Sequence, residues 1–346
     1  MKTMKNFFKG KSVLITGGTG SLGSELIDIF LNEYNLKRLV IFSRDELKQS
    51  ILKKRIFLKD KKEIIRFFLG DVRDFERLKL ATRDIDYIIH AAALKHVDIA
   101  EYNPLEFIKT NIEGAKNLIN ASLENNVKRV MALSTDKAAN PINLYGATKL
   151  VSDKLFISAN NISGGKTTRF AVVRYGNVVS SRGSVIPFFL KLKNQGQNYF
   201  PITDKQMTRF WITLNQSANL VLKSFTRMFG GEIFVPKIPS VRIIDIAKAI
   251  APEKKVKITG IRPGEKLNEI LCSKDEFLNT IEFKNHYVIK PTIKFIDKNL
   301  DFKINKIKEK GRYVKRDFEY SSSNNSNFLT VEQLKKFINE LKDSDI

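Results

Sequence analysis

An aspartate, two lysines and a tyrosine lie close together in the stretch STDKAANPINLYGATK, residues 134–149. Asp136 and Lys137 are adjacent, and Tyr145 and Lys149 are four residues apart, so the latter two would share one face of a helix. An ammonium beside a phenol favours the phenolate, which can take the proton of an alcohol. Asp136 and Lys137 leave two interpretations open: an acid and a base in a reaction, or a capped loop with a surface ion pair.

A glycine-rich turn near the start of the chain predicts a nucleotide site. Gly17, Gly20 and Gly23 follow the short apolar run SVLIT and open an apolar-periodic segment. This spacing lets the backbone turn tightly, brings a pyrophosphate to a helix N-terminus and lets the helix pack on a sheet. A tight turn without a ligand is the alternative. The strand before, the helix after and the return to a second strand favour dinucleotide binding.

The residues after the second expected strand bear on which dinucleotide binds. An NAD enzyme usually places an acid there against the ribose 2′-hydroxyl, whereas this chain reads FSRDE, residues 42–46. Ser43 and Arg44 favour the 2′-phosphate of NADP, although Asp45 and Glu46 keep NAD open as an alternative. Asp71, at the end of the third strand, either meets the adenine or caps a turn.

These motifs need a scaffold, and the chain predicts one by alternating short apolar runs with longer periodic segments. That alternation is typical of a parallel sheet covered by helices on both faces. We therefore predict an α/β fold, a Rossmann-type doubly wound parallel sheet with a smaller α/β substrate lobe. The expected strands are Ser12–Thr16, Arg38–Ser43, Ile65–Leu69, Tyr87–Ala91, Arg129–Ser134, Arg169–Tyr175 and Glu232–Val235.

The alternation loosens after Tyr175, where glycine, proline and serine become frequent. We predict that residues 1–175 form the dinucleotide-binding domain and that residues 208–238 return to it. Residues 176–207 and 239–346 are expected to form the substrate-binding lobe. Thr330 and Gln333 have the spacing of a capping box that opens a last amphipathic helix through Leu341.

The chain resembles the extended short-chain dehydrogenase/reductase family in five motifs. They are the glycine-rich turn, Asp71-Val72, AAA at 91–93, ST at 134–135 and Tyr145-x-x-x-Lys149. Within this family, the chain is similar to the inverting UDP-N-acetylglucosamine 4,6-dehydratases of pseudaminic acid synthesis, a pathway that serves flagellin glycosylation. The segments that carry this similarity are RYGNVVSSRGSVIP, DKQMTRFWIT, GGEIFVPKIPS and IRPGEKLNE. The resemblance runs from about Ser12 to the FEYSSSNN segment. Leu22 stands where an aromatic residue is common in the family, a packing change that we expect to be silent.

The resemblance implies a chemical role for each member of the first stretch. Tyr145 takes the C4 hydroxyl proton while Thr135 and Lys149 hold the geometry, and a tightly bound, recycled NADP takes the hydride. Lys137 removes the C5 proton, for which it must be neutral, a state that desolvation and nearby cations can provide. Asp136, protonated, gives its proton to the departing C6 hydroxyl. Reprotonation of C5 from the opposite face gives UDP-2-acetamido-2,6-dideoxy-β-L-arabino-hex-4-ulose.

The resemblance also implies the binding residues. The expected cofactor contacts are Gly17, Thr19, Gly20, Ser21, Leu22, Gly23, Ser43, Arg44, Asp45, Glu46, Leu47, Lys48, Asp71, Val72, Ala91, Lys95, Thr110, Asn111, Tyr145 and Lys149. The expected contacts of the UDP-sugar are Lys95, Asn177, Val178, Val185, Thr203, Arg209, Arg262 and Glu265. Guanidinium groups suit a diphosphate because they can pair bidentately with its oxygens.

Composition adds few limits. The formal net charge is +23, yet most charges have the spacing of solvated helix faces, and we predict no nucleic-acid partner. Cys272 is the single cysteine, so no intramolecular disulfide can form. The three histidines, His90, His96 and His286, lack metal-ligand spacing, and we predict no metal. We expect a cytoplasmic protein without membrane insertion, and the family suggests a homo-oligomer, either a dimer or a hexamer.

Two rival functions remain open. A related nucleotide-sugar 4-epimerase or a retaining 4,6-dehydratase would use the same general plan, but an epimerase needs no acid for a C6 hydroxyl. A basic nucleic-acid-binding protein on a dinucleotide fold would need a basic surface interleaved with aromatic side chains, which the sequence does not suggest.

Overall fold

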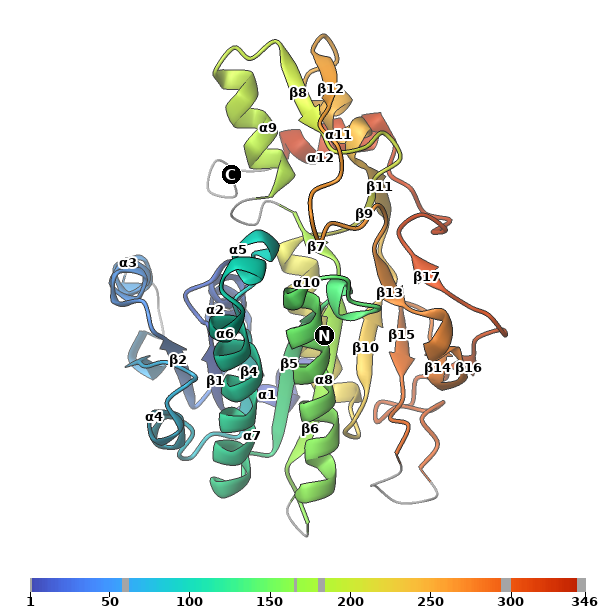
Figure 1. Cartoon of the computed structure of the whole chain (residues 1–346). Helices are drawn as coiled ribbons and strands as arrows, with labels where there is room; N and C mark the ends of the chain where they lie inside the picture. The colour runs from blue at the N-terminus through green and yellow to red at the C-terminus, as the bar shows by residue number, and fades with distance from the viewer. Residues whose placement is uncertain (1, 58–61, 165–166, 180–183, 294–299, 341–346) are drawn as a thin grey trace.

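The computed structural model describes residues 2–57, 62–164, 167–179, 184–293 and 300–340. Within these ranges the largest sheet has ten strands in the order β16-β14-β15-β10-β6-β5-β4-β1-β2-β3 (Figure 1). The strands from β10 to β3 are parallel, in the order that a Rossmann-type sheet adopts. They are β1 (Ser12–Thr16), β2 (Arg38–Ser43), β3 (Ile65–Leu69), β4 (Tyr87–His90), β5 (Arg129–Thr135), β6 (Arg169–Tyr175) and β10 (Ile233–Pro236). The predicted α/β fold is confirmed, with each strand boundary within one residue of expectation.

The sheet is covered on both faces, which explains the continuous apolar runs of its strands. Val13 and Ile15 of β1 belong to one hydrophobic core, and Leu14 between them belongs to the other. The first core is shared with α1 (Lys2–Phe8), α2 (Ser21–Glu33), α3 (Glu46–Phe57) and α10 (Leu214–Arg227). The second is shared with α4 (Phe75–Ala81), α7 (Gly114–Glu124) and α8 (Leu144–Ile162).

A smaller lobe lies at one end of the large sheet (Figure 1). Its core packs Phe189 against Phe200 with ring centroids 4.8 Å apart, and Trp211 against Phe337 at 5.8 Å. Its strands are β7 (Asn177–Val178), β8 (Tyr199–Ile202), β9 (Thr208–Ile212), β11 (Ser240–Arg242) and β12 (Lys255–Ile258). Its helices are α9 (Val185–Asn194), α11 (Ile243–Ile250) and α12 (Val331–Asn339).

The observed strand pairing divides the chain differently from our prediction in two places. β9 begins the segment expected to return to the dinucleotide domain, but it pairs with β7 and β11 in the lobe. The second difference is that β14 (Thr280–Glu282), β15 (His286–Ile289) and β16 (Arg312–Tyr313) extend the large sheet as antiparallel strands, although residues 239–346 were assigned to the lobe. Short antiparallel strands add to an open sheet edge through tertiary contacts that local periodicity does not encode.

Other elements include the last helix, three short helical segments and one small two-stranded sheet. The predicted capping box of Thr330 and Gln333 is present at the start of α12, while Leu341 lies outside the described residues. The short elements beside the first domain are α5 (Val97–Tyr102), α6 (Pro104–Phe107) and a π-helical turn at Ile108–Glu113. A further pair, β13 (Ile270–Cys272) and β17 (Tyr320–Ser321), joins the segment before β14 to the C-terminal region.

Candidate active site

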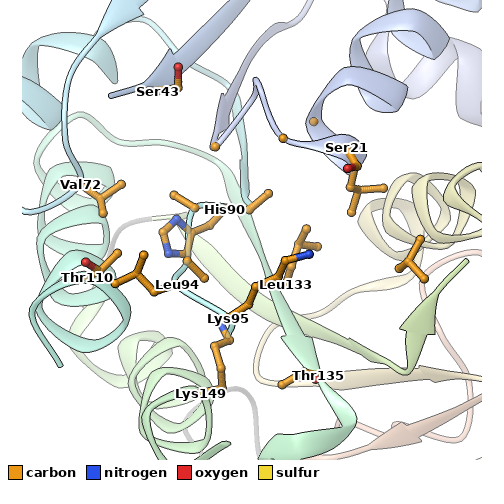
Figure 2. Close-up of a pocket in the computed structure, with 18 of the residues that line it drawn as sticks. Ser21, Ser43, Val72, His90, Leu94, Lys95, Thr110, Leu133, Thr135 and Lys149 are labelled. Carbon is orange, nitrogen blue, oxygen red and sulfur yellow. The ribbon is translucent and has the colours of Figure 1, made fainter. Parts of the chain in front are cut away.

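A cavity of about 680 Å³ opens where the parallel strands of the first domain end (Figure 2). Ser43 lies toward one end of it, and Thr135 and Lys149 lie toward the other. The glycine-rich turn and the catalytic stretch therefore line one continuous cavity although they are far apart in the sequence. This arrangement follows from parallel strands, whose carboxyl ends meet at one edge of the sheet.

The glycine-rich turn forms a cradle that only glycine permits. Gly17 has φ +66°, and a Cβ built on it would lie 2.8 Å from the backbone nitrogen of Ala92. Gly20 caps α2 without a side-chain hydrogen bond, so the first N–H groups of that helix remain available to an anion. Thr110 lines the same cavity, and its buried Oγ1 has no hydrogen-bond partner among the described residues. These features fit a bound dinucleotide.

The end of the cavity near β2 carries the residues expected at the adenosine. The Arg44 guanidinium lies 3.7 Å from the Asp71 carboxylate, and both line the cavity. Asp71 also accepts hydrogen bonds from the backbone and side chain of Arg73. Burial alone would raise the pKa of Asp71, but Arg73 and Arg44 outweigh it and lower that pKa. Of the other expected contacts here, Asp45 and Lys48 line the cavity, whereas Glu46 and Leu47 do not.

Asn111 was predicted to contact the cofactor, but its side chain holds the scaffold together instead. Its amide oxygen accepts from the Leu94 N–H at 2.9 Å, and its amide nitrogen donates to the Leu94 carbonyl and to Thr148 Oγ1, both at 3.0 Å. Asn111 therefore ties the loop after β4, which lines the cavity, to the catalytic helix α8. Its own side chain does not line the cavity.

Helix α8 brings Tyr145 and Lys149 into the cavity. Asn143 caps its first turn by accepting the Gly146 N–H at 2.7 Å, and a Cβ on Gly146 would overlap the carbonyl of Lys137. The helix can therefore approach the catalytic stretch closely. Burial raises the pKa of the Tyr145 phenol to about 12, while the Lys137 charge and a hydrogen bond with the Thr135 side chain oppose this rise.

Lys149 has a buried acidic neighbour that the sequence did not single out. Burial lowers the pKa of the Lys149 ammonium, and the charge of Asp153, one turn further along α8, opposes that effect. Asp153 accepts a 2.6 Å hydrogen bond from the Ser134 hydroxyl and lies 3.8 Å from the fully buried Arg174. Arg174 in turn pairs with Glu276 at 3.1 Å. Lys149 therefore lies next to a network of charged groups formed by Asp153, Arg174 and Glu276.

Asp136 and Lys137 form a short 3₁₀ turn after β5, at the inner end of the cavity. The Lys137 ammonium lies 3.1 Å from Asp136 Oδ1 and 2.9 Å from Oε1 of Glu269. Asp136 is buried, and its Oδ1 also accepts a hydrogen bond from Thr135 at 3.0 Å. The turn is capped by Thr135, which accepts the Lys137 N–H, but the pair is not a surface ion pair, because Asp136 is buried and Lys137 is only 21% exposed.

Burial and the nearby Glu269 charge raise the pKa of Asp136, which favours its protonated form. Burial alone would lower the pKa of Lys137, but the Asp136 and Glu269 charges outweigh it and raise that pKa. The expectation that desolvation and nearby cations leave Lys137 neutral is therefore wrong for this arrangement. The Glu269 carboxylate and the Asp136 carboxyl both contact the ammonium and stabilise its charged form.

Glu269 is the main residue that sequence reasoning missed. It lies within the IRPGEKLNE motif, but its contact with Lys137 joins segments far apart in the chain, so no local spacing could reveal it. Burial would raise the pKa of Glu269, whereas Lys137 and Arg209 outweigh that effect and lower it.

The expected sugar-nucleotide contacts fall into two groups. Lys95, Asn177 and Val178 line the cavity, and desolvation lowers the pKa of the Lys95 ammonium. The others lie on the lobe and do not line this cavity: Val185, Thr203, Arg209, Arg262 and Glu265. Glu265 Oε1 lies 3.5 Å from Arg209 and 2.9 Å from Arg262, so each guanidinium faces a carboxylate that a diphosphate would have to replace.

His90 is buried at the end of β4, as predicted, and it also lines the cavity (Figure 2). Its Nδ1 lies 2.8 Å from Thr16 Oγ1, and burial lowers its pKa to about 3. Among the described residues, no three His, Cys, Asp or Glu side chains are grouped so that they could hold a metal. Within those same ranges, no helix has both the length and the apolar character needed to cross a membrane.

Comparison with known proteins bears on the whole chain. Residues 13–291 match the family model described as polysaccharide biosynthesis protein. An inverting UDP-N-acetylglucosamine 4,6-dehydratase from Campylobacter jejuni is 57% identical over 96% of this chain and 98% of its own. A UDP-glucose 4-epimerase from Rickettsia bellii is 43% identical over 82% and 83%. The X-ray structure of Pen from Bacillus thuringiensis is 36% identical, with a TM-score of 0.85 over 96% and 98%.

Proposed function

Since the chain belongs to the polysaccharide biosynthesis protein family of extended short-chain dehydrogenases/reductases, we propose that it is an inverting UDP-N-acetylglucosamine 4,6-dehydratase. The product would be the 4-keto-6-deoxy sugar with inverted configuration at C5. Support comes from the similarity to the Campylobacter jejuni dehydratase, which extends over nearly all of both chains.

One structural observation carries the proposal. A buried carboxyl whose pKa is raised, Asp136, reaches the same cavity as the phenol of Tyr145 and the glycine cradle. A carboxyl that keeps its proton can donate it to a leaving hydroxyl, as a dehydratase requires at C6. An enzyme that only oxidises and reduces C4 has no use for such an acid.

Tyr145 accepts the proton of the C4 hydroxyl in the first step. Thr135, which hydrogen-bonds with the phenol, and Lys137 both favour its ionised form. A bound nicotinamide dinucleotide supplies the hydride acceptor at C4 and the hydride donor at C6. The glycine cradle, Thr110 and Lys149 are the residues that would hold it. With a carbonyl at C4, the C5 hydrogen becomes acidic enough for an amine to remove.

Lys137 removes the C5 proton, and Asp136 then protonates the C6 hydroxyl, which leaves as water. The 3.1 Å contact between the two side chains allows the proton gained by Lys137 to replace the one that Asp136 gave away. The two residues therefore return to their starting state after each turnover. C5 takes its new proton from solvent on the opposite face, and Tyr145 releases to solvent the proton that it took from the C4 hydroxyl.

The UDP part of the substrate would extend from the cavity toward the lobe. Asn177 and Val178 lie at the boundary, on a strand that belongs to the lobe but lines the cavity. Arg209 and Arg262 would bind the diphosphate and Glu265 the ribose, with the uracil against Val185 and Thr203. The positions of Val185 on α9 and Arg209 on β9 support this path.

The decisive experiment is incubation of the NADP-loaded protein with UDP-N-acetylglucosamine in deuterated water, followed by NMR of the product. We expect a 6-deoxy-4-keto sugar with deuterium at C5 and inverted C5 configuration. Unchanged substrate would contradict the proposed function.

NADP is the proposed dinucleotide because Ser43 and Arg44 line the adenosine end of the cavity. Arg44 has an exposed side chain that can turn toward a 2′-phosphate, although Asp71 competes for it. We expect the wild type to have a lower KM for NADP than for NAD. Arg44→Ala should lose this preference for NADP. A preference for NAD would exclude this role of Arg44.

A second candidate is a nucleotide-sugar 4-epimerase, which the 43% identity to the Rickettsia bellii protein favours. The same NMR experiment separates the two, because an epimerase product keeps its C6 hydroxyl. From the resemblance alone we also propose that the product enters pseudaminic acid synthesis and that the chain forms a cytoplasmic homo-oligomer, which light scattering would measure.

A further inference from the structure

Glu269 lies behind the catalytic stretch in a fixed and dry position. Its side chain is 1% exposed, and its Oε1 lies 2.9 Å from the Lys137 ammonium. Its backbone is held on both sides by Ser322, which accepts the Glu269 N–H at 2.9 Å and donates to its carbonyl at 2.8 Å. The carboxyl therefore faces Lys137 without the freedom to turn into solvent.

The groups around this pair set its charge balance. Asp136 contacts Lys137 from the 3₁₀ turn. Arg209 of β9 lies 3.9 Å from Glu269, and the charge of Lys266, in the preceding loop, lowers the pKa of Glu269. Tyr145 of α8 faces Lys137 across the cavity. Asp136 Oδ2 and Glu269 Oε2 are both buried without a hydrogen-bond partner in the described part of the chain. Each carboxyl can therefore carry a proton without giving up its contact with Lys137.

We propose that Glu269 is a positioning residue that acts through Lys137, accepting the ammonium proton so that a neutral amine faces C5 of the sugar. An N–H bond of Lys137 breaks and an O–H bond on Glu269 forms, which turns an ion pair into a neutral pair. The freed amine lone pair then takes the C5 proton, and the electrons of that C–H bond pass into the C4 carbonyl. The inference rests on the proposed function.

Substrate binding would trigger this transfer. A sugar that fills the cavity excludes water, and a drier site favours the neutral pair over the ion pair. Arg209 holds Glu269 in its charged form while the two groups are 3.9 Å apart. Once Arg209 turns to the substrate diphosphate, Glu269 loses that neighbour and its affinity for a proton rises. The base would therefore form only when substrate is present.

The test compares Glu269→Gln, Glu269→Asp and a matched control, Glu282→Gln. Glu282 also lies between a lysine and an arginine, with Lys237 at 2.8 Å and Arg312 at 3.1 Å, but it is on β14, away from the site. The readout is C5 exchange of UDP-N-acetylglucosamine with deuterated water, together with the pH profile of kcat/KM. Glutamine can still accept a hydrogen bond from Lys137 but cannot take its proton.

We expect Glu269→Gln to slow C5 exchange by about 10²–10⁴-fold at unchanged KM for the UDP-sugar, the range for loss of acid-base assistance. Its residual rate should rise with pH as hydroxide replaces the lost acceptor. Glu269→Asp should recover part of the rate, and Glu282→Gln should match the wild type. If Glu269→Gln does not fold, Glu269→Asp carries the test through a reduced rate at unchanged KM.

If Glu269 acted only through its charge, Glu269→Gln would speed up C5 exchange instead of slowing it. Removing the Glu269 charge would lower the pKa of Lys137, so exchange in Glu269→Gln would be faster at neutral pH and its rise would move to lower pH. That result, or exchange at the wild-type rate in Glu269→Gln or Glu269→Asp, would overturn the inference and leave the proposed function intact. A wild type that neither exchanges nor forms product would instead reject the proposed function itself.

Discussion

Asp136 and Lys137 are neighbours in sequence, yet the site prepares them for opposite tasks. Asp136 is buried near a second carboxylate, so it keeps a proton that it can donate. Lys137 contacts both carboxylates, so it has an acceptor for its own proton at hydrogen-bond distance. A general acid and a general base can thus coexist in one small volume because Asp136 holds one proton while Lys137 and Glu269 share another.

Single substitutions should separate the two roles. Lys137→Ala is expected to lose C5 exchange and product formation together, each by about 10²–10⁴-fold. Asp136→Asn should keep C5 exchange but lose water elimination to a similar extent, because an amide cannot supply the proton. Deuterium at C5 and the keto-sugar product are measured in the same NMR experiment. Exchange retained in Lys137→Ala, or normal elimination by Asp136→Asn, would reassign these residues.

Residue types and spacing drew attention to Asp136, Lys137 and Tyr145, and the family resemblance gave them their expected roles. Types and spacing could not identify Glu269 or Asp153 as partners. Glu269 reaches Lys137 only because β13 and the C-terminal segment fold against the catalytic turn, and Asp153 matters because Arg174 of β6 is buried beside it. Both contacts depend on tertiary structure, which spacing in the sequence does not record.

At the scale of elements, the turn between β1 and α2 should tolerate little change. Gly17→Ala would both strain a left-handed backbone, at about 1–2 kcal/mol, and press a methyl group against Ala91 and Ala92. Gly10→Ala is the matched control, because Gly10 has φ +67° with nothing within 4 Å of its Cβ position.

We expect both variants to lose stability in urea unfolding from the backbone strain, and Gly17→Ala to lose more because its methyl group also meets Ala91 and Ala92. Only Gly17→Ala should also lose the extra stability that added NADP gives the wild type, since its cradle is deformed. Equal stabilisation of the two variants by NADP would show that the turn does not hold the dinucleotide.

The parallel strands were predicted closely because most of them are buried on both faces and consist largely of apolar residues. The lobe strands were not, and two of them, β7 and β11, have only two or three residues. Such short strands carry no measurable alternation, and β7 pairs in parallel with β9 across a long stretch of chain. The lobe could be expected from the change in composition but not drawn strand by strand.

At the scale of the whole molecule, a chain of ion pairs connects the cavity with the surface of the lobe. It runs from Lys137 to Glu269, Arg209, Glu265 and finally Arg262. Arg262 is 77% exposed, while Glu269 and Arg209 are buried and Lys137 and Glu265 are partly buried. A substrate diphosphate that binds the outer arginines would therefore change the charge balance at the catalytic lysine through contiguous contacts.

Arg262→Ala tests whether the outer end of this chain binds the substrate. Loss of a charge-assisted hydrogen bond costs about 1.5–3 kcal/mol, so the KM for UDP-N-acetylglucosamine should rise about 10- to 100-fold while the KM for NADP stays unchanged. Arg312→Ala is the matched control, because Arg312 is 83% exposed and pairs with Glu282 at 3.1 Å on the far edge strand. The measurement is the steady-state KM of the two variants for the UDP-sugar. Equal KM values would remove Arg262 from the binding site. The lobe would then have to bind the diphosphate through other residues.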